Sequence, residues 1–111
     1  MSDVSEPHPR LARFVALKAK FPQSEMPRWS LATALEELDR VPEAIAEFRE
    51  LVQLKPDYCV AWLRLGACLA KVGDAAAARE ALGRAIQLAM AQGHQAPRTE
   101  ALGILAELDD D

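Results

Sequence analysis

The sequence predicts an all-α fold, an α-solenoid of antiparallel helix-turn-helix hairpins with about six helices. Three observations support this prediction. Alanine and leucine are abundant and only 5% of residues are aromatic, a composition that favours helices. Like residues recur at an interval of about 34 residues, and signals for helix starts and ends recur with them. With 111 residues, the chain fits a single domain over residues 1–111.

The first expected element is a lone helix over residues 8–22. Its apolar positions at helical spacing are Leu11, Phe14, Val15 and Leu17. This stripe ends at Pro22, since a proline restricts the residue before it and disfavours further helix. The stripe matches the second helix of a hairpin, so we interpret the segment as a half-repeat.

Two full repeats follow. A shift by one repeat interval pairs Pro22 with Pro56, Leu31 with Leu65, Ala32 with Gly66, Leu35 with Leu69, and Ala44 with Ala78. A period of this length made of two helical patterns is typical of hairpins whose apolar faces are covered by neighbouring copies. We therefore expect one repeat over residues 25–58 and a second over residues 59–92.

Small residues are expected where the two helices of each hairpin cross. Ala32 or Gly66 on the first helix should meet Ala44 or Ala78 on the second, because only small side chains let two backbones approach closely. The core side chains expected around these crossings are Trp62, Leu65, Phe48 and Leu82. Gly73 is suited to end a helix and Asp74 to cap the next one. Residues 39–42 serve the same turn in the first repeat, with a proline suited to a first helical turn.

The last expected element is a capping helix over residues 96–108. Gly93 should interrupt the preceding helix, and Pro97 should start the next. The apolar residues of this capping helix are Ala101, Leu102, Ile104, Leu105 and Leu108. Because Met90 stands in place of a closing proline, the second helix of the second repeat should continue towards Gln92.

The second repeat reads Trp62-x2-Leu65-Gly66-x2-Leu69, then Gly73-Asp74, then Ala78-x3-Leu82. This pattern resembles the tetratricopeptide repeat family, and the resemblance extends from about Pro9 to Leu108. It implies a right-handed superhelix whose first helices line a concave groove. It also implies a protein-protein interaction module that binds a peptide or helix of a partner protein in that groove. The first repeat departs from the pattern, with Arg28 in place of tryptophan and Trp29 one position later.

The groove residues are assigned by the same resemblance, from the repeat positions that face inwards in the family. They are Met26, Trp29, Thr33, Glu36, Glu37, Val60, Leu63, Ala67, Ala70 and Lys71. This lining is apolar in the middle and charged at one edge, which suits a hydrophobic side chain or an amphipathic helix. Trp29 and Thr33 stand where chaperone-binding members carry Lys and Asn, so a chaperone C-terminus is not the expected ligand.

Two other interpretations stay open for the groove. In one, the N-terminal residues or the C-terminal helix of the same chain lie over Trp29, Met26 and Leu63. In the other, a second copy covers them, and the chain is a self-associating structural unit, a homodimer that uses the same apolar surfaces. Light scattering across protein concentrations separates an open monomer from a homodimer.

The sequence offers no candidates for catalysis, so we expect no enzyme, no cofactor and no metal ion. His8 and His94 have no metal-binding partner at helical spacing and are expected at the surface. Glu36, Glu37 and Asp39 form an acidic cluster, but adjacent residues on a helix point in different directions. No glycine-rich phosphate loop is found in the sequence.

Charge and cysteine usage indicate the setting of the protein. A formal charge of −4 argues against nucleic acid as a partner. Cys59 and Cys68 lie roughly 13 Å apart if they share one helix, too far for a disulfide, so free thiols in a reducing compartment are expected. Residues 1–7 lack the pattern of a signal peptide, and no apolar run has membrane-spanning length. We therefore expect a cytoplasmic protein without membrane contact, and an acidic, solvated C-terminus at residues 109–111.

Overall fold

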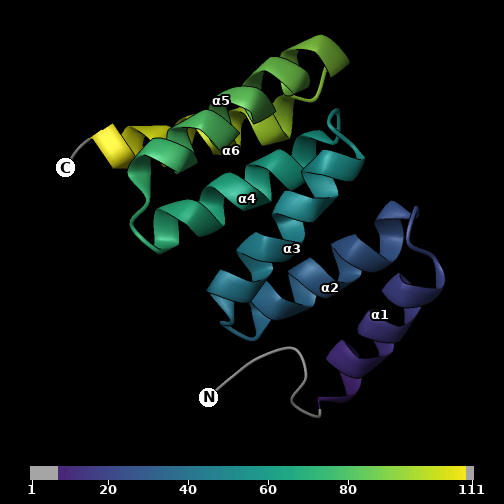
Figure 1. Cartoon of the computed structure of the whole chain (residues 1–111). Helices are drawn as coiled ribbons and strands as arrows, with labels where there is room; N and C mark the ends of the chain where they lie inside the picture. The colour runs from purple at the N-terminus through teal and green to yellow at the C-terminus, as the bar shows by residue number, and fades with distance from the viewer. Residues whose placement is uncertain (1–7, 110–111) are drawn as a thin grey trace. The chain divides into compact units, whose positions relative to one another are not determined.

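The computed structural model describes residues 8–109, and all secondary structure in this range is helical. The helices are α1 (Pro9–Lys20), α2 (Glu25–Glu37), α3 (Val41–Leu54), α4 (Cys59–Lys71), α5 (Ala75–Gln92) and α6 (Gln95–Asp109) (Figure 1). Within each of the two compact units described below, consecutive helices pack against each other, and the all-helical structure confirms the predicted all-α class. The predictions for residues 1–7 and for Asp110 and Asp111 lie outside the described residues.

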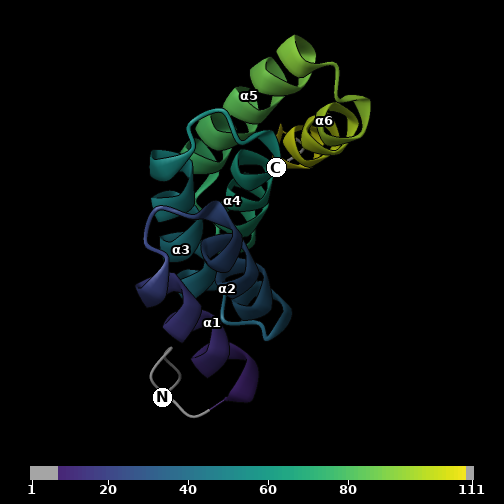
Figure 2. The same cartoon turned by 90° about the vertical axis from the view of Figure 1, so that its right-hand side faces the viewer.

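The contacts divide the chain into two compact units at the junction of Pro56 and Asp57. In the first unit, α2 packs against both α1 and α3. In the second unit, α5 packs against α4 and α6, and α6 also contacts α4 (Figure 2). Helix α4 begins and ends one repeat interval after α2, as the sequence period requires.

The core of the first unit is aliphatic around one aromatic ring. Its largest fully buried side chains are Phe48, Leu11, Leu31, Leu35 and Leu51. Each of these side chains stabilises the fold by roughly 1.5–3 kcal/mol through removal of apolar surface from water. Leu11 is the buried residue of α1, and Phe14 and Leu17 of the same helix are half-buried.

The crossing of α4 and α5 leaves little space at Gly66. A Cβ atom at Gly66 would lie 2.6 Å from both Cγ and Cδ2 of Leu82, and the three nearest atoms all belong to that leucine. Leu82 is therefore the residue that a side chain at position 66 would meet first. Phe48, Leu65 and Leu82 are buried as predicted. Trp62 is only partly buried, where it packs against Cys59, Leu88 and Ala89, so its prediction as a core residue was wrong in extent.

The turns between paired helices use the residues that the sequence indicated. Gly73 has a φ of +83°, and Asp39, its counterpart in the first repeat, has a φ of +60°. The carboxylate of Asp74 accepts a hydrogen bond from the backbone N–H of Ala77 at 3.3 Å, which makes Asp74 the N-cap of α5. Helix α5 continues to Gln92 and ends at Gly93, whose φ is +73°.

Helix α6 begins and ends within one residue of the predicted capping helix. Ala101 is fully buried, and Ile104, Leu105 and Leu108 are half-buried. Leu102 is 48% exposed and lies outside the buried face of the helix. The apolar residues of α6 are therefore divided between a packed face and a solvent-exposed face.

Candidate functional site

The predicted groove residues of the first unit lie along α2. Met26 is 60% exposed, while Trp29, one turn later, is half-buried. The Trp29 ring meets the buried Phe48 ring edge to face, with centroids 5.9 Å apart. The hydroxyl of Thr33 donates a hydrogen bond to the carbonyl of Trp29 at 2.9 Å. Helix α2 therefore presents an adaptable thioether beside a ring that is fixed by the core.

Carboxylates lie at the C-terminal end of the same helix. Glu36 is half-buried and Glu37 is exposed. Glu37 pairs with Arg10 of α1, with Nη2 and Oε1 2.6 Å apart, although both side chains are at least half exposed. An ion pair so exposed to water contributes little to stability. A cationic group of a partner could compete for this carboxylate.

The predicted groove residues of the second unit lie along α4 and differ in exposure. Val60 and Ala70 are half-buried, and Lys71 is exposed. Leu63 and Ala67, in contrast, are only 3% and 8% exposed. The structure therefore leaves accessible surface at the two ends of this row and little in its middle.

A cluster of ion pairs joins all three helices of the first unit. The ammonium of Lys18 lies 2.9 Å from Glu47 and 3.1 Å from Glu50. Arg28 also pairs with Glu50, and its Nη2 donates to the carbonyl of Pro22 at 3.1 Å. Burial opposes the charge of Lys18, but hydrogen bonds and attraction from Glu47 and Glu50 outweigh it, so the pKa of Lys18 is raised.

These charges border a hollow of about 310 Å³ in the first unit. Its lining residues are Val15, Lys18, Ala19, Pro22, Arg28, Leu31 and Glu47. The Nε of Arg28 is buried and finds no hydrogen-bond partner among the described residues. The other polar groups of the cluster already hold one another, so this hollow is occupied by internal ion pairs at its polar end.

A second hollow, of about 490 Å³, lies between α4 and α5. We call it the Trp62 hollow. Its lining residues are Trp62, Arg79, Glu80, Gly83, Arg84 and Gln87. A Cβ atom at Gly83 would meet nothing within 4 Å, so open space extends over the backbone of α5 at this point.

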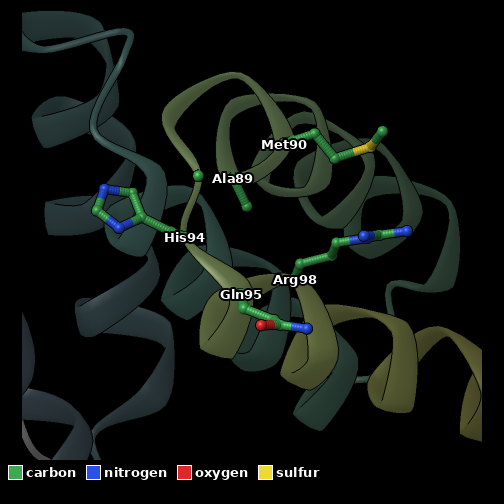
Figure 3. A pocket seen from close by; sticks show the side chains of 6 residues that line it. Ala89, Met90, His94, Gln95 and Arg98 are labelled. Atoms are coloured by element: carbon green, nitrogen blue, oxygen red, sulfur yellow. The ribbon is translucent and has the colours of Figure 1, made fainter.

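A third hollow, of about 300 Å³, lies at the turn between α5 and α6. In Figure 3, the side chains of Met90 and Arg98 extend in the same direction, whereas the ring of His94 points away from Arg98. Met90 is 61% exposed. Gln95 completes the polar side of this hollow, which therefore has an amide and a guanidinium but no carboxylate in its lining.

Solved structures have a similar helical fold. The tetratricopeptide repeat domain protein from Salinibacter ruber superposes with a TM-score of 0.72, covering 78% of this chain and 97% of that chain at 24% sequence identity. The chain has a tetratricopeptide-repeat-like fold. A Bordetella parapertussis protein with a known solution structure gives a TM-score of 0.76 at 28% identity, over 89% of this chain and 86% of that chain. No protein-family model matches the sequence, and no curated protein matches it.

The two cysteines of this tetratricopeptide-repeat-like chain are buried and form no disulfide, as the sequence predicted. Burial raises the pKa of the Cys59 thiol, whose S–H donates to the carbonyl of Ala85 at 3.3 Å. A thiol with a raised pKa is a poor nucleophile, because the thiolate is the reactive form. Cys59 therefore acts as a packing residue between α4 and α5.

The two histidines differ from each other in exposure. His94 is exposed, as predicted, but His8 is half-buried at the N-cap of α1, so the prediction for His8 was wrong. The described residues bring no three His, Cys, Asp or Glu side chains into a group that would hold a metal ion. Between residues 8 and 109, every helix is too short or too polar to span a membrane.

Sequence reasoning missed the ion-pair cluster and the Trp62 hollow. Each depends on side chains from different helices that share no sequence motif. One signal was present, since the repeat position of Trp62 carries Arg28 in the first repeat. A polar residue at a position expected to be core indicates that the surroundings of this position are open or charged.

Proposed function

We propose that the chain is a protein-interaction module that binds a peptide or helix of a partner protein through the first helices of its repeats. The tetratricopeptide-repeat-like fold supports a role of this general kind. Such a role requires no catalytic residue, cofactor or metal ion, and we propose none. A cytoplasmic location agrees with two cysteines that form no disulfide.

One observation supports the choice of surface most strongly: an exposed methionine lies next to a fixed tryptophan on α2. Large exposed apolar side chains beside a half-buried aromatic ring are typical of binding surfaces. Trp29 loses little conformational freedom on binding because Phe48 already orients it. Met26 can adapt its three rotatable bonds to the partner.

The charges at the end of α2 suggest the chemistry of the partner. Glu36 and Glu37 follow the apolar residues along the helix, so a basic residue near the apolar anchor of the partner would meet them. In the second unit, the exposed Lys71 and the half-buried Val60 and Ala70 offer the accessible part of the proposed surface. The partner is therefore expected to present apolar side chains at helical spacing, with a basic residue beyond them.

A selection from a random peptide library on the purified full chain tests this proposal. We expect the selected peptides to bind the Met26→Glu variant at least about tenfold more weakly, because a buried carboxylate replaces an apolar contact. Met90→Glu is the matched control, since Met90 is equally exposed on α5. Circular dichroism melts should be alike for both variants and the wild type.

One outcome would contradict the proposal. If Met26→Glu binds the selected peptides as well as Met90→Glu does, the α2 surface is not the binding surface. Light scattering then tests the homodimer. A mass that doubles with concentration in the wild type, but not in Met26→Glu, would assign α2 to self-association.

A further inference from the structure

The Trp62 hollow combines a fixed aromatic ring with two arginines on one side of the second unit. Trp62 packs against Cys59, Leu88 and Ala89, which orient the ring from the core side. Its ring is only partly buried, and it lines the open hollow. A ring held in this way offers a large contact surface at low cost in conformational entropy.

The two guanidinium groups of the hollow make long, exposed contacts of their own. Arg79 Nη2 lies 3.4 Å from Asp109 Oδ1, where the side chains are 48% and 69% exposed. Arg84 Nη1 lies 3.5 Å from Gln87 Oε1, at the outer limit of a hydrogen bond. Contacts of this length in water are weak, so a better acceptor can replace them.

The charge of the lining favours an anion. Arg79 and Arg84 contribute two positive charges to the lining and Glu80 one negative charge, so the lining itself carries a net positive charge that Asp109, beside Arg79, offsets in the free protein. The carboxylate of Asp109 already approaches Arg79 from the end of α6. By contrast, the arginine and lysine of the first-unit hollow are held by Glu47 and Glu50.

We propose that the Trp62 hollow binds an acidic peptide segment of a partner protein. Carboxylates of the segment pair with Arg79 and Arg84, and an apolar side chain beside them packs on Trp62. Asp109 occupies the Arg79 end in the free protein and is displaced by the peptide. This surface lies in the second unit, so the inference does not depend on the α2 surface of the proposed function.

Fluorescence anisotropy with the full chain tests the proposal. The probe is a short fluorescein-labelled peptide in which aspartate and leucine alternate, and its twin carries asparagine in place of aspartate. The acidic peptide should bind at least about tenfold more tightly than the twin, because only carboxylates form charge-assisted hydrogen bonds with arginine. Binding should weaken as salt is added.

Three variants place the binding in the hollow. Arg84→Gln should lower the affinity for the acidic peptide by about three- to tenfold, because one charged donor is lost. Asp109→Asn should raise this affinity by about two- to threefold, since the competing carboxylate is removed from Arg79. Arg98→Gln is the matched control, an exposed arginine at the α5–α6 hollow, and should change binding by less than about twofold.

Several outcomes would overturn the proposal. Equal losses of peptide affinity in Arg84→Gln and Arg98→Gln would indicate general charge attraction. Weaker peptide binding in Asp109→Asn would exclude the displacement of Asp109 by the peptide. No binding of the acidic peptide at millimolar concentration would also overturn it. In a nitrogen–proton correlation spectrum, the indole signal of Trp62 should shift on binding. A shift of Trp29 alone would assign the peptide to α2 instead.

Discussion

Two sites that correspond in the repeat contain different chemistry in the two units. In the first unit, Arg28 of α2 pairs with Glu50 of α3. In the second unit, the equivalent repeat positions carry Trp62 and Arg84, which line an open hollow. The first site is filled by ion pairs, and the second keeps a partly buried aromatic ring and an exposed guanidinium at an open hollow.

The buried neighbours of the two sites also differ in charge. Glu47 is buried beside Lys18, whereas Ala81, its counterpart in the second repeat, is buried without a charge. The hairpin accommodates a charged residue or an alanine at this position. Its small residues and leucines fix the crossing of the helices, while flanking positions vary. A repeat scaffold can therefore change one flank from an internal ion cluster into a binding surface without a change of fold.

The largest expected effect concerns the crossing itself, where Gly66 of the second unit corresponds to Ala32 of the first. Gly66→Ala should lower the free energy of unfolding by about 1–3 kcal/mol, because the new methyl group would overlap Leu82. Gly103→Ala is the control, since a Cβ there meets nothing within 4 Å. It should raise the free energy of unfolding by about 0.5–1 kcal/mol. Urea denaturation measures both, and a stabilised Gly66→Ala would show that the crossing has room.

A smaller effect is expected from the ion cluster of the first unit. Glu47→Gln should lower the free energy of unfolding by about 1–2 kcal/mol, because the partly buried Lys18 loses a charged acceptor. Glu107→Gln, at an exposed carboxylate, should change it by less than about 0.5 kcal/mol. Equal stabilities of the two variants would show that Glu50 alone neutralises Lys18.

The same cluster should make the free energy of unfolding depend on pH, and the direction of this dependence follows from the pKa of Lys18. Its pKa in the folded protein lies above the ordinary value of 10.5, so folding favours the protonated lysine. The resulting stabilisation is complete at neutral pH and is lost as pH rises through the raised pKa. The difference in the free energy of unfolding between the wild type and Glu47→Gln, measured by urea denaturation, should therefore be constant between about pH 7 and pH 9. It should become smaller near about pH 11.

The smallest effect is expected at the turns, where Asp39 and Gly73 adopt the same left-handed conformation at equivalent repeat positions. Asp39→Gly should raise the free energy of unfolding by about 0.5 kcal/mol, since glycine adopts positive φ without steric cost. Gly73→Asp should lower it by a similar amount. Thermal melts of the two variants and of the double exchange measure this, and shifts of the same sign would contradict the equivalence of the turns.

Much of the fold could be predicted because its signals are local. Gly73, Asp74 and Gly93 act on the backbone within a few residues, so their roles as helix ends follow from the sequence. The burial of Phe48 and Leu82 follows from helical periodicity. The partial exposure of Trp62 had only one indirect sequence signal, the arginine at the equivalent position of the first repeat, because exposure depends on the packing of two helices.

The candidate surfaces were less predictable for a related reason. The resemblance placed Leu63 and Ala67 in a groove, but it carries no information on their exposure, which depends on packing in this particular chain. The pairing of Arg10 with Glu37 joins residues 27 positions apart and has no sequence signature. Surface assignments from repeat positions are therefore hypotheses about helix faces, and exposure has to come from the structure.

The distribution of two residue types makes each unit separately observable. Trp29 lies in the first unit and Trp62 in the second, so single-tryptophan variants give each unit its own fluorescence signal. Both cysteines lie on α4 and are buried, so a thiol reagent in the solvent gains access to them only through structural opening of the second unit. Pulsed thiol labelling together with Trp29 fluorescence would therefore establish the order in which the two units unfold.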